Sequence, residues 1–107
     1  MSTNRSLIVP IDKQGMADYE NDVTKTDRLK PFILPESEFN LLFKSGYFAD
    51  LNARFNLLID DYEEEVIPPS ALEYAKKQLN ELTANCPIFS EALNYAIQQN
   101  TELCLEF

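Results

Sequence analysis

The chain has 107 residues, of which 45% are hydrophobic and 11% aromatic, so it can fold as one domain around a single core. Its 18 aspartate and glutamate residues outnumber 9 lysine and arginine residues, and the net charge of −9 argues against direct binding to nucleic acid or to an anionic membrane. Histidine is absent, which removes the usual catalytic triads and zinc sites and makes an enzyme the least expected class.

The first 30 residues combine a short apolar run with a long polar stretch. The run "LIVPI", residues 7–11, predicts a strand, and Pro10 favours the edge of a sheet because proline cannot donate to a strand ladder. It is too short for a signal-peptide core or a membrane span, so we expect a cytoplasmic protein. Residues 12–30 show no helical period and predict a loop or irregular arm.

Two helices are expected next. The first, "SEFNLLFKS", has Glu36 and Glu38 near its start, where the helix dipole favours negative charge, and Gly46 just after its end. The second runs through "YFADLNARFNLLIDDYEEE", because its apolar residues recur at helical spacing. Those residues are Phe48, Leu51, Phe55, Leu58, Ile59 and Tyr62. The prolines of "VIPP" end this helix.

Two further helices and a terminal strand complete the prediction. Ser70 and Glu73 form a capping box that begins the third helix, and Pro87 lies in the first turn of the fourth. The alternation in "ELCLEF" predicts a strand, which could pair with "LIVPI". The expected fold is therefore a single domain, residues 1–107, mostly α (α or α+β), with about four helices in residues 36–100 and a possible two-stranded pairing of its N- and C-terminal segments.

The cysteines and glycines indicate no cofactor. Cys86 and Cys104 lack a CxxC spacing and are expected to be small buried hydrophobes in a reducing compartment. With only two glycines, the chain has no dinucleotide-binding fingerprint, P-loop or nucleophile motif. We therefore predict no catalytic residue, no metal ligand and no cofactor.

An acidic run inside the second predicted helix is the candidate functional feature. On that helix, Asp60 and Glu64 are like charges four residues apart, and the run lies at the C-terminal end, where the dipole disfavours anions. Either the run is a solvated helix end, or its cost is tolerated because a basic partner binds there. The predicted partner-binding residues are Asp60, Asp61, Tyr62, Glu63, Glu64 and Glu65.

Other interpretations of the run fit less well. A calcium loop would need a characteristic spacing of oxygen ligands around a glycine, which is missing. A glycosidase-like carboxylate pair would need a cleft between two elements, and neighbouring helical positions do not form one. Tyrosines are enriched at interface hot spots, so Tyr19, Tyr74 and Tyr95 are candidates, beside Tyr62, for the rim of a binding surface.

The stretch "FKSGYFADLNARFNLLIDDYEEEVIPPSALEYAKKQL", residues 43–79, resembles small bacterial immunity proteins of polymorphic-toxin and contact-dependent growth inhibition systems. The elements compared are the "SGYF..LN" helix junction, the "LIDDYEEE" acidic end and the "L..A...L" helix that follows. The resemblance implies a cytoplasmic, non-catalytic protein that binds one cognate toxin domain, often a nuclease, and blocks its active site. The first 30 residues show no matching feature.

Physical chemistry agrees with that implication, because a nuclease cleft must be basic to bind phosphates and a carboxylate patch can occupy it. Two alternatives remain open. One is an acidic nucleic-acid mimic that inhibits a restriction or CRISPR effector, although such a mimic would spread its charge in rows at phosphate-like spacing. The other is a non-catalytic adaptor subunit, for which an exposed apolar surface is expected.

Overall fold

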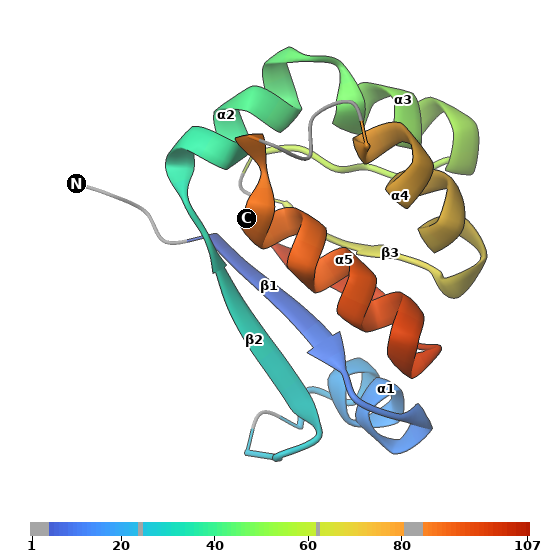
Figure 1. Ribbon diagram of the computed structural model, residues 1–107. Coiled ribbons are helices and arrows are strands. Elements are labelled where there is room, and N and C mark those ends of the chain that lie inside the picture. Colours follow the sequence, from blue (N-terminus) through green and yellow to red (C-terminus); the bar gives the residue numbers. More distant parts are fainter. Residues whose placement is uncertain (1–4, 24, 62, 81–84) are drawn as a thin grey trace.

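The computed structural model describes residues 5–23, 25–61, 63–80 and 85–107, which form an α+β fold (Figure 1). Its helices and strands are interspersed along the chain. In order they are β1 (Arg5–Pro10), α1 (Lys13–Glu20), β2 (Leu29–Leu34), α2 (Glu36–Lys44), α3 (Tyr47–Phe55), β3 (Glu64–Ile67), the 3-10 helix η1 (Pro69–Ala71), α4 (Leu72–Leu79), α5 (Pro87–Gln99) and β4 (Leu103–Glu106).

The strands form one antiparallel sheet in the order β2-β1-β4-β3. Strand β1 is therefore internal, and the prediction that Pro10 places it at an edge is wrong. The reason is register: β1 pairs with β4 only from Ser6 to Ile8, so Pro10 lies beyond the last pair and its missing N–H leaves no gap in the ladder. The edges of the sheet are β2 and β3.

The prediction of a mostly α fold with a two-stranded pairing is wrong. The two terminal segments do pair, but as β1 and β4 in the middle of a four-stranded sheet. The second predicted helix stops at Phe55, because Asn56 adopts a left-handed conformation with a φ of 56°, which asparagine tolerates better than most residues. The residues "EEVI" then extend as β3.

Part of the segment 12–30, predicted as a loop or irregular arm, is helix α1. Its first turn is capped by Asp12, whose carboxylate accepts from the N–H of Gly15 at 2.8 Å and also pairs with Arg28. Gly15 leaves no room for a side chain, because a Cβ there would collide with the carbonyl of Arg28. A glycine required by close packing lowers helix propensity, which is why the sequence pattern did not indicate this helix.

Helices α2 to α5 cover one face of the sheet, and α1 stands apart at the end of β1 (Figure 1). The alternation in β1 follows this layering, since Leu7 and Val9 are fully buried while Ser6 and Ile8 on the other face are half-buried. Phe48 and Phe89 are the largest fully buried side chains, and their rings pack 5.9 Å apart. Cys86 and Cys104 are both buried and unbonded to each other, as predicted.

A buried carboxylate fixes the start of α5. Helix α5 begins at Pro87, and its N-cap residue Cys86 makes no side-chain cap. Instead, Glu38 of α2 accepts from the N–H groups of Ile88 at 3.2 Å and Phe89 at 3.0 Å, and Glu38 is only 4% exposed. A carboxylate at a helix N-terminus satisfies unpaired donors and complements the dipole, so it ties α2 to α5.

We predict that Glu38→Ala lowers the free energy of unfolding by about 2–3 kcal/mol, because one buried and one half-buried N–H group lose a charged acceptor. Glu38→Gln should cost less, since the amide oxygen can still accept. Urea unfolding measured by circular dichroism gives both values. Glu36→Ala is not a suitable control, because Glu36 bonds to the side chain of Arg5. The control is Glu91→Ala at an exposed position of α5, which should change the free energy of unfolding by under about 0.5 kcal/mol. Equal stability of all three variants would contradict the capping role.

Candidate functional site

The acidic segment, defined as residues 60–65, does not lie on a helix. Residues 57–61 form an irregular loop after α3, and Glu64 and Glu65 begin the edge strand β3. The electrostatic cost that was argued from a helix dipole and from helical spacing therefore does not apply. Tyr62 lies outside the described residues.

The loop before the acidic segment is held by one asparagine. The side chain of Asn52 on α3 donates to the carbonyl of Ile59 at 2.9 Å and accepts from the N–H of the same residue at 2.7 Å. The side chain of Ile59 is buried in the core. This two-way clamp gives the irregular backbone the hydrogen bonds that it would otherwise lack.

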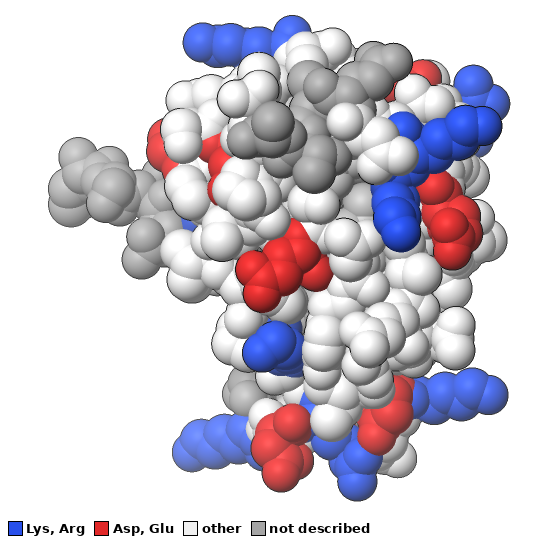
Figure 2. Space-filling view, in the orientation of Figure 1, with Lys and Arg blue, Asp and Glu red and all other residues white. Residues whose placement is uncertain are grey.

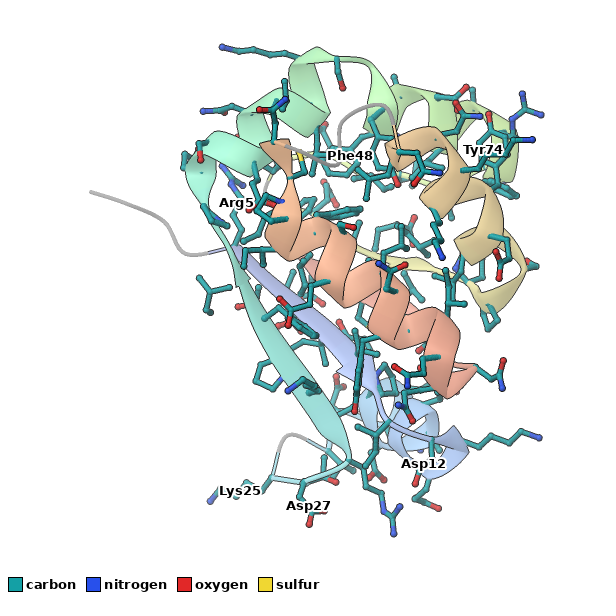
Figure 3. The ribbon with its side chains drawn as sticks, in the orientation of Figure 1. Arg5, Asp12, Lys25, Asp27, Phe48 and Tyr74 are labelled. Atoms are coloured by element: carbon teal, nitrogen blue, oxygen red, sulfur yellow. The ribbon has the colours of Figure 1, made fainter. Side chains whose placement is uncertain are left out.

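Asp61 is committed to the buried side chain of Arg5 on β1. Arg5 Nη1 donates to Asp61 Oδ1 at 2.7 Å, while Nε and Nη2 donate to both carboxylate oxygens of Glu36 at 3.0 and 3.2 Å. The guanidinium also lies 3.6 Å from the ring centroid of Phe39, and Figure 3 shows Arg5 beneath α2. The hydrogen bond to Glu36 outweighs burial and raises the pKa of Arg5, so Arg5 stays charged.

Glu65 is also used inside the molecule. Its carboxylate accepts from the N–H of Leu58 at 2.8 Å through one oxygen and from the N–H of Val66 at 2.8 Å through the other. The first bond ties the loop to β3, and the second satisfies a backbone donor on an edge strand. Because both of its carboxylate oxygens bond to the backbone, Glu65 stabilises the loop and the strand and is not available to bind a partner.

Three carboxylates of the acidic segment remain at the surface. Asp60, Glu63 and Glu64 are exposed, and none of them forms an ion pair with a described Lys or Arg. Beside them Leu58 is 76% exposed, the highest value among the large hydrophobic side chains that the structure describes. The five predicted residues that the structure describes therefore fall into two groups. Asp60, Glu63 and Glu64 are exposed to solvent, whereas Asp61 and Glu65 bond within the molecule.

The open face of the sheet extends this surface toward α1. Glu64 on β3 lies directly opposite Glu106 on β4, and Tyr19 of α1 donates its hydroxyl hydrogen to Glu106 Oε2 at 3.1 Å. A hollow of about 560 Å³ lies here. We call it the α1 groove and define it by its lining residues, which are Ile8, Tyr19, Asp22, Val23, Thr26, Leu29, Pro31, Glu64 and Glu106.

A second hollow, of about 850 Å³, lies on the other side of Tyr19 between α1 and the end of β3, and it includes Lys13 and Glu102. Burial raises the pKa of Glu102, and burial also raises the pKa of Tyr19, so the phenol stays protonated. The thiol of Cys104 has a pKa raised by burial as well. A thiol in that state is a poor nucleophile.

Sequence reasoning missed Glu106, although a signal for it existed. The alternation of "ELCLEF" predicted a strand, and alternation places Glu106 on the face opposite Leu105. Tyr19 was expected at a rim and lies in the groove. Two other tyrosines are used elsewhere: Tyr74 donates to Asp50 at 2.7 Å at the outer end of α4 (Figure 3), and the ring of Tyr95 packs against Phe32.

Among the described residues, the helical face shows charges of both signs rather than an acidic concentration (Figure 2). Figure 2 views that face, where Lys and Arg are interspersed with Asp and Glu around a broad uncharged area. In the part of the chain that the structure describes, no three Cys, Asp or Glu side chains gather in a way that could hold a metal ion. None of the described helices combines the length and apolar character needed to cross a membrane.

The sequence matches no protein-family model and no curated protein, and the fold matches no solved structure. The resemblance to immunity proteins therefore stays a prediction from the motifs quoted above. What the site can do follows from its own groups. Exposed carboxylates beside exposed apolar side chains can bind a surface that offers Lys or Arg together with apolar contacts.

We predict that Arg5→Lys lowers the free energy of unfolding by about 1.5–3 kcal/mol, because an ammonium can replace neither the paired bonds to Glu36 nor the stacking on Phe39. Since Glu36 is 48% and Asp61 40% exposed, water limits the loss. Unfolding in guanidinium chloride measures this change in the free energy of unfolding. The control is Arg54→Lys on the surface of α3, where an exposed guanidinium lies 4.4 Å from the ring centroid of Tyr74, so the control measures the loss of stacking at an exposed site. An equally small effect of both changes would rule out the anchoring role.

Proposed function

We propose that the chain is a non-catalytic protein that binds and neutralises a basic partner, a bacterial toxin domain of the nuclease type, by covering its active-site surface. The contact surface consists of Leu58, Asp60, Glu63 and Glu64. A nuclease must bind phosphates and therefore presents Lys and Arg around its active site. A protein that presents carboxylates at the same place competes with the nucleic acid.

The exposure of Leu58 is the observation that carries this proposal. The side chain of Leu58 is 76% exposed, while its own N–H is bonded to Glu65 and its neighbour Ile59 is bonded to Asn52. These backbone hydrogen bonds fix the chain at Leu58 and Ile59, and the side chain of Leu58 faces water. An apolar anchor with polar residues around it is the usual arrangement of an interface hot spot.

The distribution of charge supports the same function. Asp61 and Glu65 stabilise the loop, so Asp60, Glu63 and Glu64 are held in place without being neutralised by a described cation. A pre-positioned set of like charges costs little further entropy on binding and accelerates the encounter with a basic surface. The toxin class rests on the resemblance of residues 43–79, and the preference for a basic partner rests on charge.

The first experiment is capture of the partner. Tagged protein is incubated with lysate of the source cells, washed at low and moderate salt, and the retained proteins are identified by mass spectrometry. One basic partner of nuclease size at fixed stoichiometry, whose activity the chain inhibits, supports the proposal. Retention of a large nucleic-acid-processing complex would instead support the mimic, and a partner without enzymatic activity would support the adaptor.

We predict that the triple variant Asp60→Asn, Glu63→Gln and Glu64→Gln associates with the captured partner about tenfold more slowly at low salt, with a weaker dependence on salt. Surface plasmon resonance at several salt concentrations measures both effects. The control Asp27→Asn, Glu73→Gln and Glu91→Gln removes the same charge from exposed positions elsewhere and should leave association nearly unchanged. Equal slowing in both triple variants would show that net charge alone matters.

We also predict that Leu58→Ala weakens binding to the captured partner by at least about tenfold, mainly through faster dissociation, because a buried anchor at an interface costs more than 1 kcal/mol when it is truncated. Its thermal midpoint should not change, since the side chain is 76% exposed. Phe43→Ala, at a residue 43% exposed on α2, is the matched control. Unchanged affinity in Leu58→Ala would remove this residue from the interface.

A further inference from the structure

The sheet has one face that the helices leave open. Helices α2 to α5 cover the face that carries Leu7 and Leu105, whereas Ile8 and Ile33 project from the other face, where Ile33 is 55% exposed. Helix α1 and the chain after it cover only part of that open face and leave the α1 groove beside them. An apolar floor in a groove of this size is a surface to which another chain can bind.

Two carboxylates stand together in this groove. Glu64 and Glu106 are direct cross-strand neighbours on the same face, and like charges in that arrangement destabilise a sheet. Neither is paired with a cation among the described residues. The hydroxyl of Tyr19 holds Glu106 in position but brings no positive charge. The fold thus keeps an unfavourable pair that a cation from outside would relieve.

The shape and chemistry of the groove select the occupant. Ile8, Val23 and Pro31 offer apolar contacts at one side, and Glu64 and Glu106 offer acceptors at the other. The aliphatic stem of an arginine or lysine can lie on apolar side chains while its charged head reaches the carboxylates. An extended chain presents alternate side chains to one surface, so it can supply a cation and an apolar group two residues apart.

We propose that the α1 groove binds an extended basic segment of the protein partner, with one Arg or Lys side chain between Glu64 and Glu106 and an apolar side chain on Ile8 and Val23. This inference rests on the proposed function for the existence of a basic partner, and it adds a second contact region next to the acidic segment. Glu64 belongs to both regions, so the contact region in the groove and the contact region at Leu58 form one continuous surface.

The test uses the intact chain, labelled with ¹⁵N, and a synthetic acetylated peptide of alternating leucine and arginine, six residues long. A peptide with glutamate in place of arginine is the negative probe. Titration followed by amide chemical shifts should move the signals of Ile8, Val23 and Glu106 with the arginine peptide only. Glu64→Gln with Glu106→Gln should weaken this binding about tenfold, because both charged contacts are lost.

Three comparisons make the outcome decisive. The control Glu73→Gln with Glu91→Gln removes two exposed carboxylates from the helical layer and should leave peptide affinity unchanged. The thermal midpoint of the groove variant should stay close to that of the parent, because the variant loses a like-charge pair and the amide oxygen introduced by Glu106→Gln can still accept from Tyr19. Lost binding in a variant that keeps this midpoint cannot be attributed to unfolding. Asp60→Asn with Glu63→Gln should affect the peptide much less than the groove variant does.

Weaker binding only in Asp60→Asn with Glu63→Gln would overturn the groove and leave the proposed function in place. Unchanged affinity in the groove variant, or shifts confined to the helical face, would overturn the inference. Shifts at Ile8 and Val23 that depend on protein concentration without peptide would assign the groove to a second copy of the chain and also overturn it. These outcomes do not test the proposed function, which is tested by the partner-capture experiment.

Discussion

The buried guanidinium of Arg5 is the interaction on which the arrangement of this molecule depends. It joins strand β1 to helix α2 through Glu36, to the aromatic core through Phe39, and to the loop after α3 through Asp61. Glu36 follows Arg5 by 31 residues in the sequence, and Asp61 follows it by 56. A planar guanidinium suits this position because it can bond in several directions while stacking on a ring. The placement of the acidic segment therefore follows from a cation in the core.

The net charge of −9 consequently has two components with different roles. Glu36, Glu38 and Asp61 bond to buried partners, and Glu65 bonds to backbone N–H groups, so these carboxylates build the fold. Asp60, Glu63 and the facing pair Glu64 and Glu106 form no ion pair with a described Lys or Arg, although Asp60 accepts from the N–H of Asp61 and Glu106 accepts from the hydroxyl of Tyr19. Composition alone cannot separate the two groups, because both count equally in the net charge. Only the second group is available to a partner, which makes the binding surface narrower than the acidic run indicated.

Sequence reasoning found the elements that local chemistry determines. Gly46 with its φ of 85°, Pro87 in the first turn of α5 and the alternation in β4 are as predicted, because each depends on a residue and its near neighbours. The predictions that are wrong concern segments whose conformation is determined by tertiary packing. "EEVI" has no strong strand pattern of its own and extends because Val66 and Ile67 pair with β4. The capping box at Ser70 does not form, since the chain enters α4 through the turn η1 and its N-cap Ala71 makes no side-chain bond.

The error at the end of α3 matters most for function. Leu58 and Ile59 both belong to the apolar stripe of the helix that the sequence predicted, yet only Ile59 is buried. Once Asn56 turns the chain out of the helix, adjacent residues point in opposite directions, so one anchors the loop and the other faces water. Edge strands often carry charges merely to prevent aggregation, and Glu64 alone would fit that explanation. An exposed leucine beside those charges does not, because it would promote the association that the charges prevent. An exposed Leu58 next to carboxylates that form no ion pair with a described Lys or Arg is therefore better explained by a surface that binds one partner selectively than by a surface that only prevents aggregation.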